Sequence, residues 1–129
     1  MVTAAPGIES RLLDEPIAWF ATVRADGSPH VTPVWFVYRH GTWWIGCAAG
    51  SVKARNCRAR PAVALTLPDG RAPVVAEGIA TVRTAGFPVP VVEAFAEKYD
   101  GWDVRADRTG SRALIEVPTT RWLLPGVAQ

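Results

Sequence analysis

Residues 17–47 carry the clearest fold signal in the chain and read IAWFATVRADGSPHVTPVWFVYRHGTWWIGC. Three runs in this stretch are rich in β-branched and aromatic residues, which is typical of strands. They span residues 17–24, 30–38 and 42–47. The first turn contains Asp26-Gly27, a pair favoured in tight β-hairpins, and the second is Arg39-His40-Gly41. Such short turns between consecutive strands predict an antiparallel meander.

Two or three short helices are expected outside the meander. A tail and a short helix are predicted for residues 1–14. The apolar side of that helix would consist of Ile8, Leu12 and Leu13. Ser51 is a favourable N-cap for a helix over about 52–59, and a further helix is predicted over 89–98.

The rest of the chain adds strands to the meander. They are predicted over 62–67, 73–83, 111–117 and 119–124, with a polar loop over 100–110. Gly78 predicts a bulge in the long strand, and Pro118 predicts a break between the last two. The fold class is therefore mainly β, with six or seven antiparallel strands forming a barrel.

The composition limits the classes of protein to which the chain could belong. The 129 residues, of which 49% are hydrophobic, predict a single domain over 1–129 with a substantial core. A net charge of +2 argues against a general nucleic-acid binder. The sequence shows neither a membrane span nor a signal-peptide pattern. Cys47 and Cys57 fit no disulfide scaffold or metal motif, so we expect reduced thiols in a cytoplasmic protein.

The first three predicted strands have apolar residues on both faces. Four tryptophans belong to these strands, namely Trp19, Trp35, Trp43 and Trp44. A small isolated barrel buries only the inner face of its strands, so apolar outer faces predict that a second chain covers part of the outside. A homodimer is the simplest such arrangement.

The motif Ser51-Val52-Lys53-Ala54-Arg55-Asn56 is the sharpest local feature. A helix N-terminus presents unpaired backbone N–H groups and a partial positive charge. Ser51 adds a hydroxyl, and Arg55 and Arg58 share its helical face. These features predict an anion site, with phosphate as the anion. A solvated basic helix is the alternative reading of the same residues.

Four pieces of the chain, in this order and spacing, resemble the pyridoxamine-phosphate-oxidase-like and flavin-reductase split β-barrels. They are ATVRADGSPHVTPVWFVY, TWWIGC, GSVKARNCRARPAVALTL and VVAEGIATV, and they cover about half of the chain. The resemblance implies a split β-barrel in which Ser51, Lys53, Arg55 and Asn56 hold a cofactor phosphate. It further implies that Thr32, Pro33, Val34 and Trp35 line the cofactor ring.

Within this superfamily the chain is most similar to members that use the deazaflavin cofactor F420. The resemblance therefore implies an oxidoreductase that transfers a hydride between F420 and an electron-poor conjugated small molecule. By position, Trp102 is the candidate for the tryptophan that approaches the cofactor of the partner subunit in such proteins. FMN is the alternative cofactor, and a non-catalytic flavin, deazaflavin or haem binder on the same fold is a third reading. Cys47 departs from the Ser or Thr usual in the family near the phosphate.

No residues stand out as an acid–base pair, so catalytic residues are left unassigned. His30 is interpreted as an ordinary surface residue near a strand end and His40 as part of a turn. Tyr38 and Tyr99 could donate protons, but the sequence pairs neither with a base. The scattered carboxylates Glu77, Asp100, Asp103 and Asp107 form no metal-ligand pattern.

Overall fold

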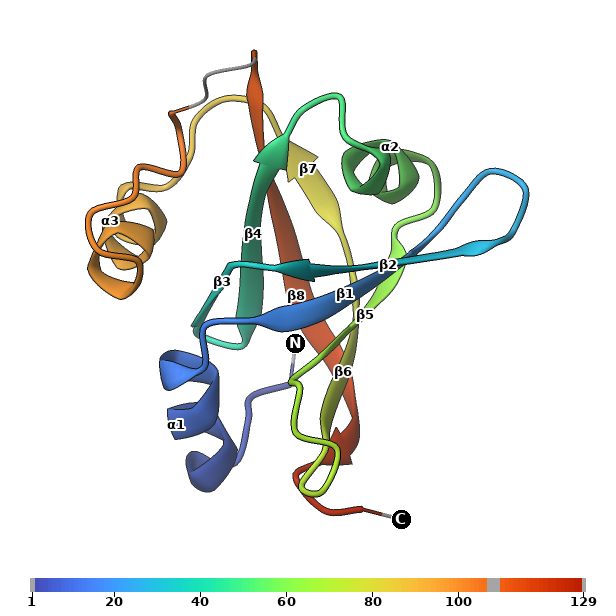
Figure 1. Cartoon of the computed structure of the whole chain (residues 1–129), viewed down its shortest axis with the longest axis vertical. Helices are drawn as coiled ribbons and strands as arrows, with labels where there is room; N and C mark the ends of the chain where they lie inside the picture. Colours follow the sequence, from blue (N-terminus) through green and yellow to red (C-terminus); the bar gives the residue numbers. More distant parts are fainter. Residues whose placement is uncertain (1, 107–109, 129) are drawn as a thin grey trace.

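The computed structural model describes residues 2–106 and 110–128 and shows, within them, eight strands and three helices (Figure 1). The helices are α1 (Pro6–Asp14), α2 (Val52–Ala59) and α3 (Val89–Lys98). The strands are β1 (Ala18–Val23), β2 (Pro29–Val34), β3 (Phe36–Arg39), β4 (Thr42–Ala48), β5 (Ala62–Thr66), β6 (Val74–Ile79), β7 (Thr81–Arg83) and β8 (Arg112–Pro125). The expected mainly β split barrel is confirmed. Part of the predicted loop 100–110, including Asp107, lies outside the described residues.

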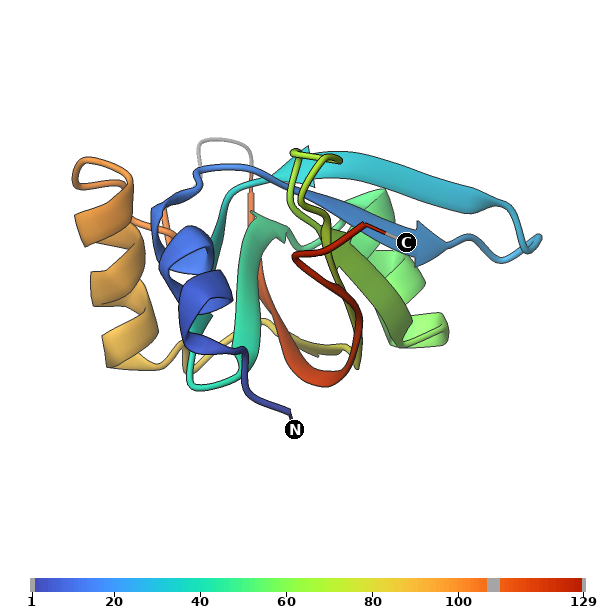
Figure 2. The ribbon, with the colours of Figure 1, turned by 90° about the horizontal axis from the view of Figure 1, so that it is seen from below.

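The strands form one antiparallel sheet that curls back on itself. Its order is β2-β1-β5-β6-β8-β4-β3, and β7 pairs with β8 beside this path. β2 and β3 follow each other in sequence but lie at opposite ends of the path, so the chain between them joins the two edges of the curled sheet. Figure 2 shows the β1–β2 hairpin as one layer, with α1 and α3 at one end of the molecule and α2 at the other. None of the helices in the described part is long and apolar enough to cross a membrane.

The predicted strand 30–38 was wrong in one respect, because it breaks at Trp35. The residues before the break pair with β1, and those after it pair with β4. At the break, the backbone N–H of Phe36 donates to the Tyr99 hydroxyl at 2.8 Å, and the Phe36 carbonyl accepts from Lys98 Nζ at 3.0 Å. Side chains at the end of α3 thus take the place of the missing strand partners.

The predicted break at Pro118 was also wrong, since β8 is continuous from Arg112 to Pro125. Proline cannot donate to a ladder, and Pro118 lies where β8 leaves β4 and joins β6. The predicted strand 73–83 instead divides at Ala80 into β6 and β7. The bulge predicted at Gly78 is confirmed by a register shift between Glu77 and Gly78.

Two hydrophobic clusters share the strand β4. Inside the barrel, Trp43 is fully buried with Phe20 and Phe36. On the other face of β4, Trp44 packs in a second cluster with Phe95 of α3. The expectation that a second chain covers these two tryptophans was therefore wrong, because the barrel interior and α3 bury them within one chain.

The first helix contributes a smaller part of the barrel core. Ile8 and Leu12 of α1 are buried in the cluster inside the barrel, but Leu13, predicted on the same side, is exposed. Ile8 and Leu12 are one turn apart and face the barrel, whereas Leu13 is rotated away by one residue. The buried stripe of this short helix is therefore narrower than its sequence suggested.

We expect Gly78→Ala to lower the free energy of unfolding by about 1–3 kcal/mol, measured by chemical denaturation. A Cβ at this position would lie 2.5 Å from the Pro118 carbonyl oxygen and 2.6 Å from Val117 Cγ1, so the backbone would have to move. Gly70→Ala is the matched control, since a Cβ there meets nothing within 4 Å. Equal stability of the two variants would contradict the close approach of β6 and β8.

Candidate functional site

A cavity of about 350 Å³ lies where the end of β2, the end of β4 and the start of α2 meet. Its lining residues are Pro33, Val34, Trp35, Gly46, Cys47, Ala48, Ser51, Lys53 and Trp102. Six of these residues are ones that the family resemblance implied would bind a cofactor, namely Pro33, Val34, Trp35, Ser51, Lys53 and Trp102. The predicted residues Thr32, Arg55 and Asn56 do not line this cavity. The fold therefore brings most of the predicted site together from segments far apart in sequence.

The start of α2 forms the cationic side of the cavity. Ser51 is the N-cap, and its hydroxyl accepts a hydrogen bond from the Ala54 N–H at 3.3 Å. Lys53 and Arg55 pair with no carboxylate among residues 2–106 and 110–128, although other arginines of the chain do form ion pairs. Arg58 is held by the backbone, since its guanidinium donates to the Ala49 carbonyl at 3.0 Å. An anion at this helix end would meet unpaired cations and the helix dipole together.

Asn56 attaches α2 to the sheet. Its side chain is buried, and its amide donates to Thr22 Oγ1 of β1 at 3.0 Å. This buried hydrogen bond fixes α2 against the sheet, and it therefore sets where Lys53 lies relative to β2. Asn56 thus acts on the candidate site by positioning the helix.

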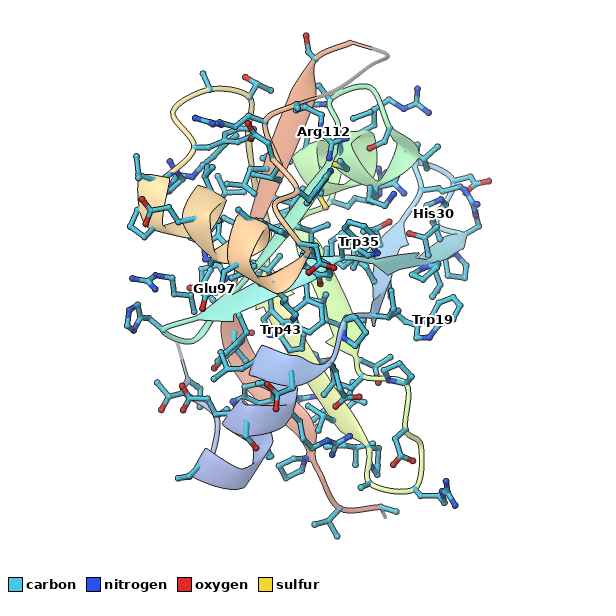
Figure 3. All side chains as sticks on the ribbon, turned by 60° about the vertical axis from the view of Figure 1, so that its left-hand side comes forward. Trp19, His30, Trp35, Trp43, Glu97 and Arg112 are labelled. Carbon is cyan, nitrogen blue, oxygen red and sulfur yellow. The ribbon has the colours of Figure 1, made fainter. Side chains whose placement is uncertain are left out.

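Aromatic side chains form the opposite wall of the cavity. The Trp35 ring stacks on Tyr99 with centroids 4.6 Å apart and an angle of 1° between the planes. Trp102 meets Trp35 edge to face at 5.3 Å, within the same chain. Trp35 is nevertheless 45% exposed, so its other face is available to a ligand or a partner (Figure 3). A flat apolar wall of this kind suits a planar conjugated ring.

Gly46 allows Trp102 to reach the cavity. A Cβ at this position would lie 3.2 Å from Trp102 Cη2 and would collide with Val104 Cγ2. The Arg112 guanidinium lies 5.5 Å from the centroid of the Trp102 ring, and its Nε donates to the Val104 carbonyl at 3.2 Å. The loop that carries Trp102 is therefore held against β4 and β8.

Neither candidate tyrosine lines this cavity. The Tyr99 hydroxyl lies within hydrogen-bond distance of the Phe36 and Pro16 carbonyls, at 2.9 Å each, and burial raises the pKa of Tyr99 to about 12. The Tyr38 hydroxyl accepts from the Ala4 N–H at 3.3 Å, and burial likewise raises its pKa. No three His, Cys, Asp or Glu side chains of the described residues gather to hold a metal.

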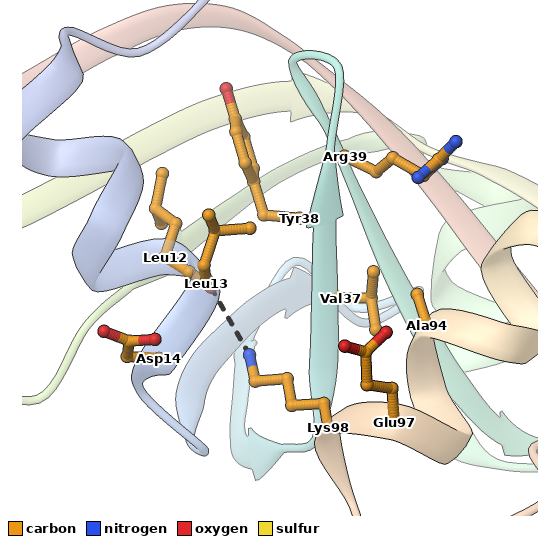
Figure 4. Close-up of a pocket in the computed structure, with 9 residues that line it drawn as sticks. All are labelled: Leu12, Leu13, Asp14, Val37, Tyr38, Arg39, Ala94, Glu97 and Lys98. Carbon is orange, nitrogen blue, oxygen red and sulfur yellow. Dashed lines mark hydrogen bonds between the residues drawn. The ribbon is translucent and has the colours of Figure 1, made fainter.

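Lys98 is a residue whose importance the sequence pattern missed. It lies in a second cavity of about 550 Å³, between α1, β3 and α3 (Figure 4). Its Nζ donates to the carbonyls of Leu12 at 3.3 Å and Phe36 at 3.0 Å, and lies 3.7 Å from the centroid of the Phe36 ring. Lys98 thus ties three elements together beside Trp35. In the sequence, it is marked only by the pair Lys98-Tyr99 at the end of the predicted helix.

Burial lowers the pKa of Lys98 to about 8, against the opposing effect of Asp14 and Glu15. Between this value and the ordinary lysine pKa, the folded chain binds fewer protons than the unfolded chain, so stability gains with rising pH. We expect the unfolding free energy of the native chain to rise by about 1 kcal/mol relative to Lys98→Met between about pH 7.5 and about pH 9.5, which is less than the full shift would give because Lys98 is only partly buried. Denaturant titrations at both pH values measure this difference.

The control for this measurement is Lys53→Met, which removes the other lysine of the chain. It should retain the pH dependence of the native chain. A Lys98→Met variant with the same pH dependence as the native chain would show that Lys98 titrates normally.

Together, the curled sheet and the cavity define a split β-barrel with a cationic helix end beside a planar aromatic wall. The family model for pyridoxamine 5'-phosphate oxidase matches residues 5–124, and the chain belongs to this family. A comparison with curated proteins finds no match.

Several solved structures share the fold. One is an F420 reductase with 27% sequence identity and a TM-score of 0.70, and the match covers 88% of this chain and 94% of that protein. A conserved hypothetical protein of Mycobacterium tuberculosis has 24% identity and a TM-score of 0.73, covering 95% of this chain and 84% of its own. HutZ, the haem storage protein of Vibrio cholerae, has 17% identity and a TM-score of 0.75, covering 98% of both chains.

Proposed function

We propose that the chain is an F420-dependent oxidoreductase that acts on an electron-poor conjugated small molecule. The observation that carries the proposal is the cavity in which the unpaired Lys53 and the capped start of α2 face Trp35 and Trp102. A phosphate-bearing cofactor with a planar ring needs both kinds of wall. The similarity to an F420 reductase favours the deazaflavin.

In this proposal, the residues of the chain bind and orient the cofactor. Ser51, Lys53 and Arg55 would hold the phosphate through charge-assisted hydrogen bonds at the helix start. Pro33, Val34 and Trp35 would support the ring. F420, when bound, would exchange a hydride with the substrate, which agrees with the lack of a free acid–base pair among the described residues lining the cavity.

FMN is the second candidate cofactor, because it combines a phosphate with a planar ring of similar shape. The family match supports a flavin as well as a deazaflavin. Haem has less support, because HutZ, at 17% identity, shares the fold alone and no histidine lines the cavity in the described part of the chain. Titration with F420 and FMN separates the two leading candidates.

We expect the double variant Lys53→Ala/Arg55→Ala to bind F420 at least about 100-fold more weakly than the native chain. Each charge-assisted hydrogen bond to a phosphate contributes roughly 1.5–3 kcal/mol. Quenching of tryptophan fluorescence during titration measures the affinity, and the same series with FMN tests the alternative cofactor. Arg71→Ala is the control, because this exposed arginine lies in the loop between β5 and β6. Native affinity in the double variant would remove the phosphate assignment.

The same proposal includes a homodimer in the cytoplasm. The outer face of β2, β1, β5 and β6 carries no helix in the described part, and Figure 2 shows this layer open on one side. The strand register places Trp19 beside Pro33, and Ala21 beside Val31. Trp19 is 40% exposed and Val31 is 53% exposed, so this face offers a second copy an apolar surface next to Trp35.

We expect Val31→Glu to convert the dimer to a folded monomer, because dimerisation would bury the charged carboxylate without a partner, at a large cost in desolvation free energy. Light scattering after gel filtration measures the mass, and circular dichroism checks the fold. Val89→Glu is the matched control, since Val89 is 65% exposed at the start of α3, away from this face. If both variants keep the mass of the native protein, the proposed interface is wrong.

A further inference from the structure

Two polar atoms on the inner face of β2 are shielded from solvent and have no partner among the described residues. They are His30 Nδ1 and Thr32 Oγ1. The two residues alternate along the strand, so their side chains share the face that also carries the buried Val34. A shielded polar atom without a hydrogen bond costs about 1–3 kcal/mol, so such a pair on one face points to a group that binds there.

Lys53 faces the same region. Asn56 of α2 is hydrogen-bonded to Thr22, and Thr22 is the register partner of His30 on β1. Lys53 precedes Asn56 by three residues and so lies on the same side of α2, one turn nearer the cavity. The charge of Lys53 contributes to lowering the pKa of His30, after the larger effects of burial and of Arg24. Asp26, the nearby acid of the β1–β2 turn, is engaged by the Ser28 N–H and hydroxyl.

We propose that His30 and Thr32, with Lys53, contact an anionic group of the ligand, and that His30 takes up a proton as the anion binds. The proposal rests on the proposed cofactor site and extends it along β2. The Thr32 hydroxyl and the Lys53 ammonium group are hydrogen-bond donors without any change in protonation. A neutral imidazole has one N–H, and proton uptake gives it a second donor and a positive charge.

The geometry also sets the shape of the ligand. His30 and Val34 are four residues apart on one strand, which corresponds to about 13 Å. A ligand that touches both the Trp35 wall and His30 must therefore be elongated, with its planar ring at one end and its anion displaced along the strand (Figure 3). FMN and F420 meet this requirement, whereas riboflavin has the ring without the phosphate.

The test compares His30→Gln with His40→Gln in titrations of the full chain with F420, FMN and riboflavin. These are the only two histidines in the sequence, and His40 lies in the exposed turn between β3 and β4. Affinities are measured at about pH 6 and about pH 8. Because the phosphate of FMN also titrates near pH 6, the informative quantity is the difference between the two variants.

We expect the native chain and His40→Gln to bind the phosphate-bearing ligand more tightly at low pH. In His30→Gln, the ratio of the affinities at about pH 6 and about pH 8 should be about tenfold smaller. A pKa rise of about one unit on binding corresponds to this factor. Riboflavin should show no such dependence in any variant. Proton uptake, measured by calorimetry in two buffers of different ionisation enthalpy, should disappear in His30→Gln alone.

If neither F420 nor FMN saturates the native chain, the proposed function is wrong and this extension fails with it. If one of them binds tightly but His30→Gln keeps the native pH dependence, the cofactor site stands and the role of His30 is overturned. Equal pH dependence for FMN and riboflavin would also overturn it, because the anion would then not be the group that His30 meets.

Discussion

The structure depends on how the chain passes from β2 to β3 at Phe36. There the peptide leaves one edge of the curled sheet and joins the other, and its backbone N–H and carbonyl groups are bonded by Tyr99 and Lys98 instead of by a neighbouring strand. Without these contacts, polar backbone groups would be left unpaired between two packed clusters. The same contacts direct Trp35 onto the Tyr99 ring, so the closure of the barrel and the aromatic wall of the cavity have one physical origin.

Burial of β4 on both faces makes this arrangement rigid. Trp43 packs inside the barrel, and Trp44 packs against α3, which carries Lys98 and is followed directly by Tyr99. The end of β4 then leads through Ala48 to Ser51 and the start of α2. The cavity is thus built at the end of a strand that cannot shift without disturbing two cores. A rigid frame of this kind keeps the residues that line the cavity at fixed separations.

Among the described residues, the charged side chains at the start of α2 differ in their partners from those elsewhere. Several arginines elsewhere form ion pairs, such as Arg83 with Glu116 at 2.7 Å and Arg121 with Glu77 at 2.8 Å. At the start of α2, by contrast, Lys53 and Arg55 have no acidic partner, and the neutral Asn56 supplies the contact that anchors the helix. Structural attachment through an amide leaves the positive charges of Lys53 and Arg55 available to an anion.

The sequence by itself determined the features that neighbouring residues encode. The cap at Ser51, the helix that follows it, the β1–β2 hairpin and the bulge at Gly78 all depend on local hydrogen bonding and backbone freedom, and each was predicted. Tertiary structure alone decided the break at Trp35, the continuity of β8 through Pro118, and the burial of Trp43 and Trp44. It also decided the positions of Lys98 and His30. Lys98 bonds to Phe36 across 62 positions of sequence, and β8 changes partners because β4 and β6 meet it from different parts of the chain. Such contacts depend on which segments meet in space, and no local pattern of residues specifies them.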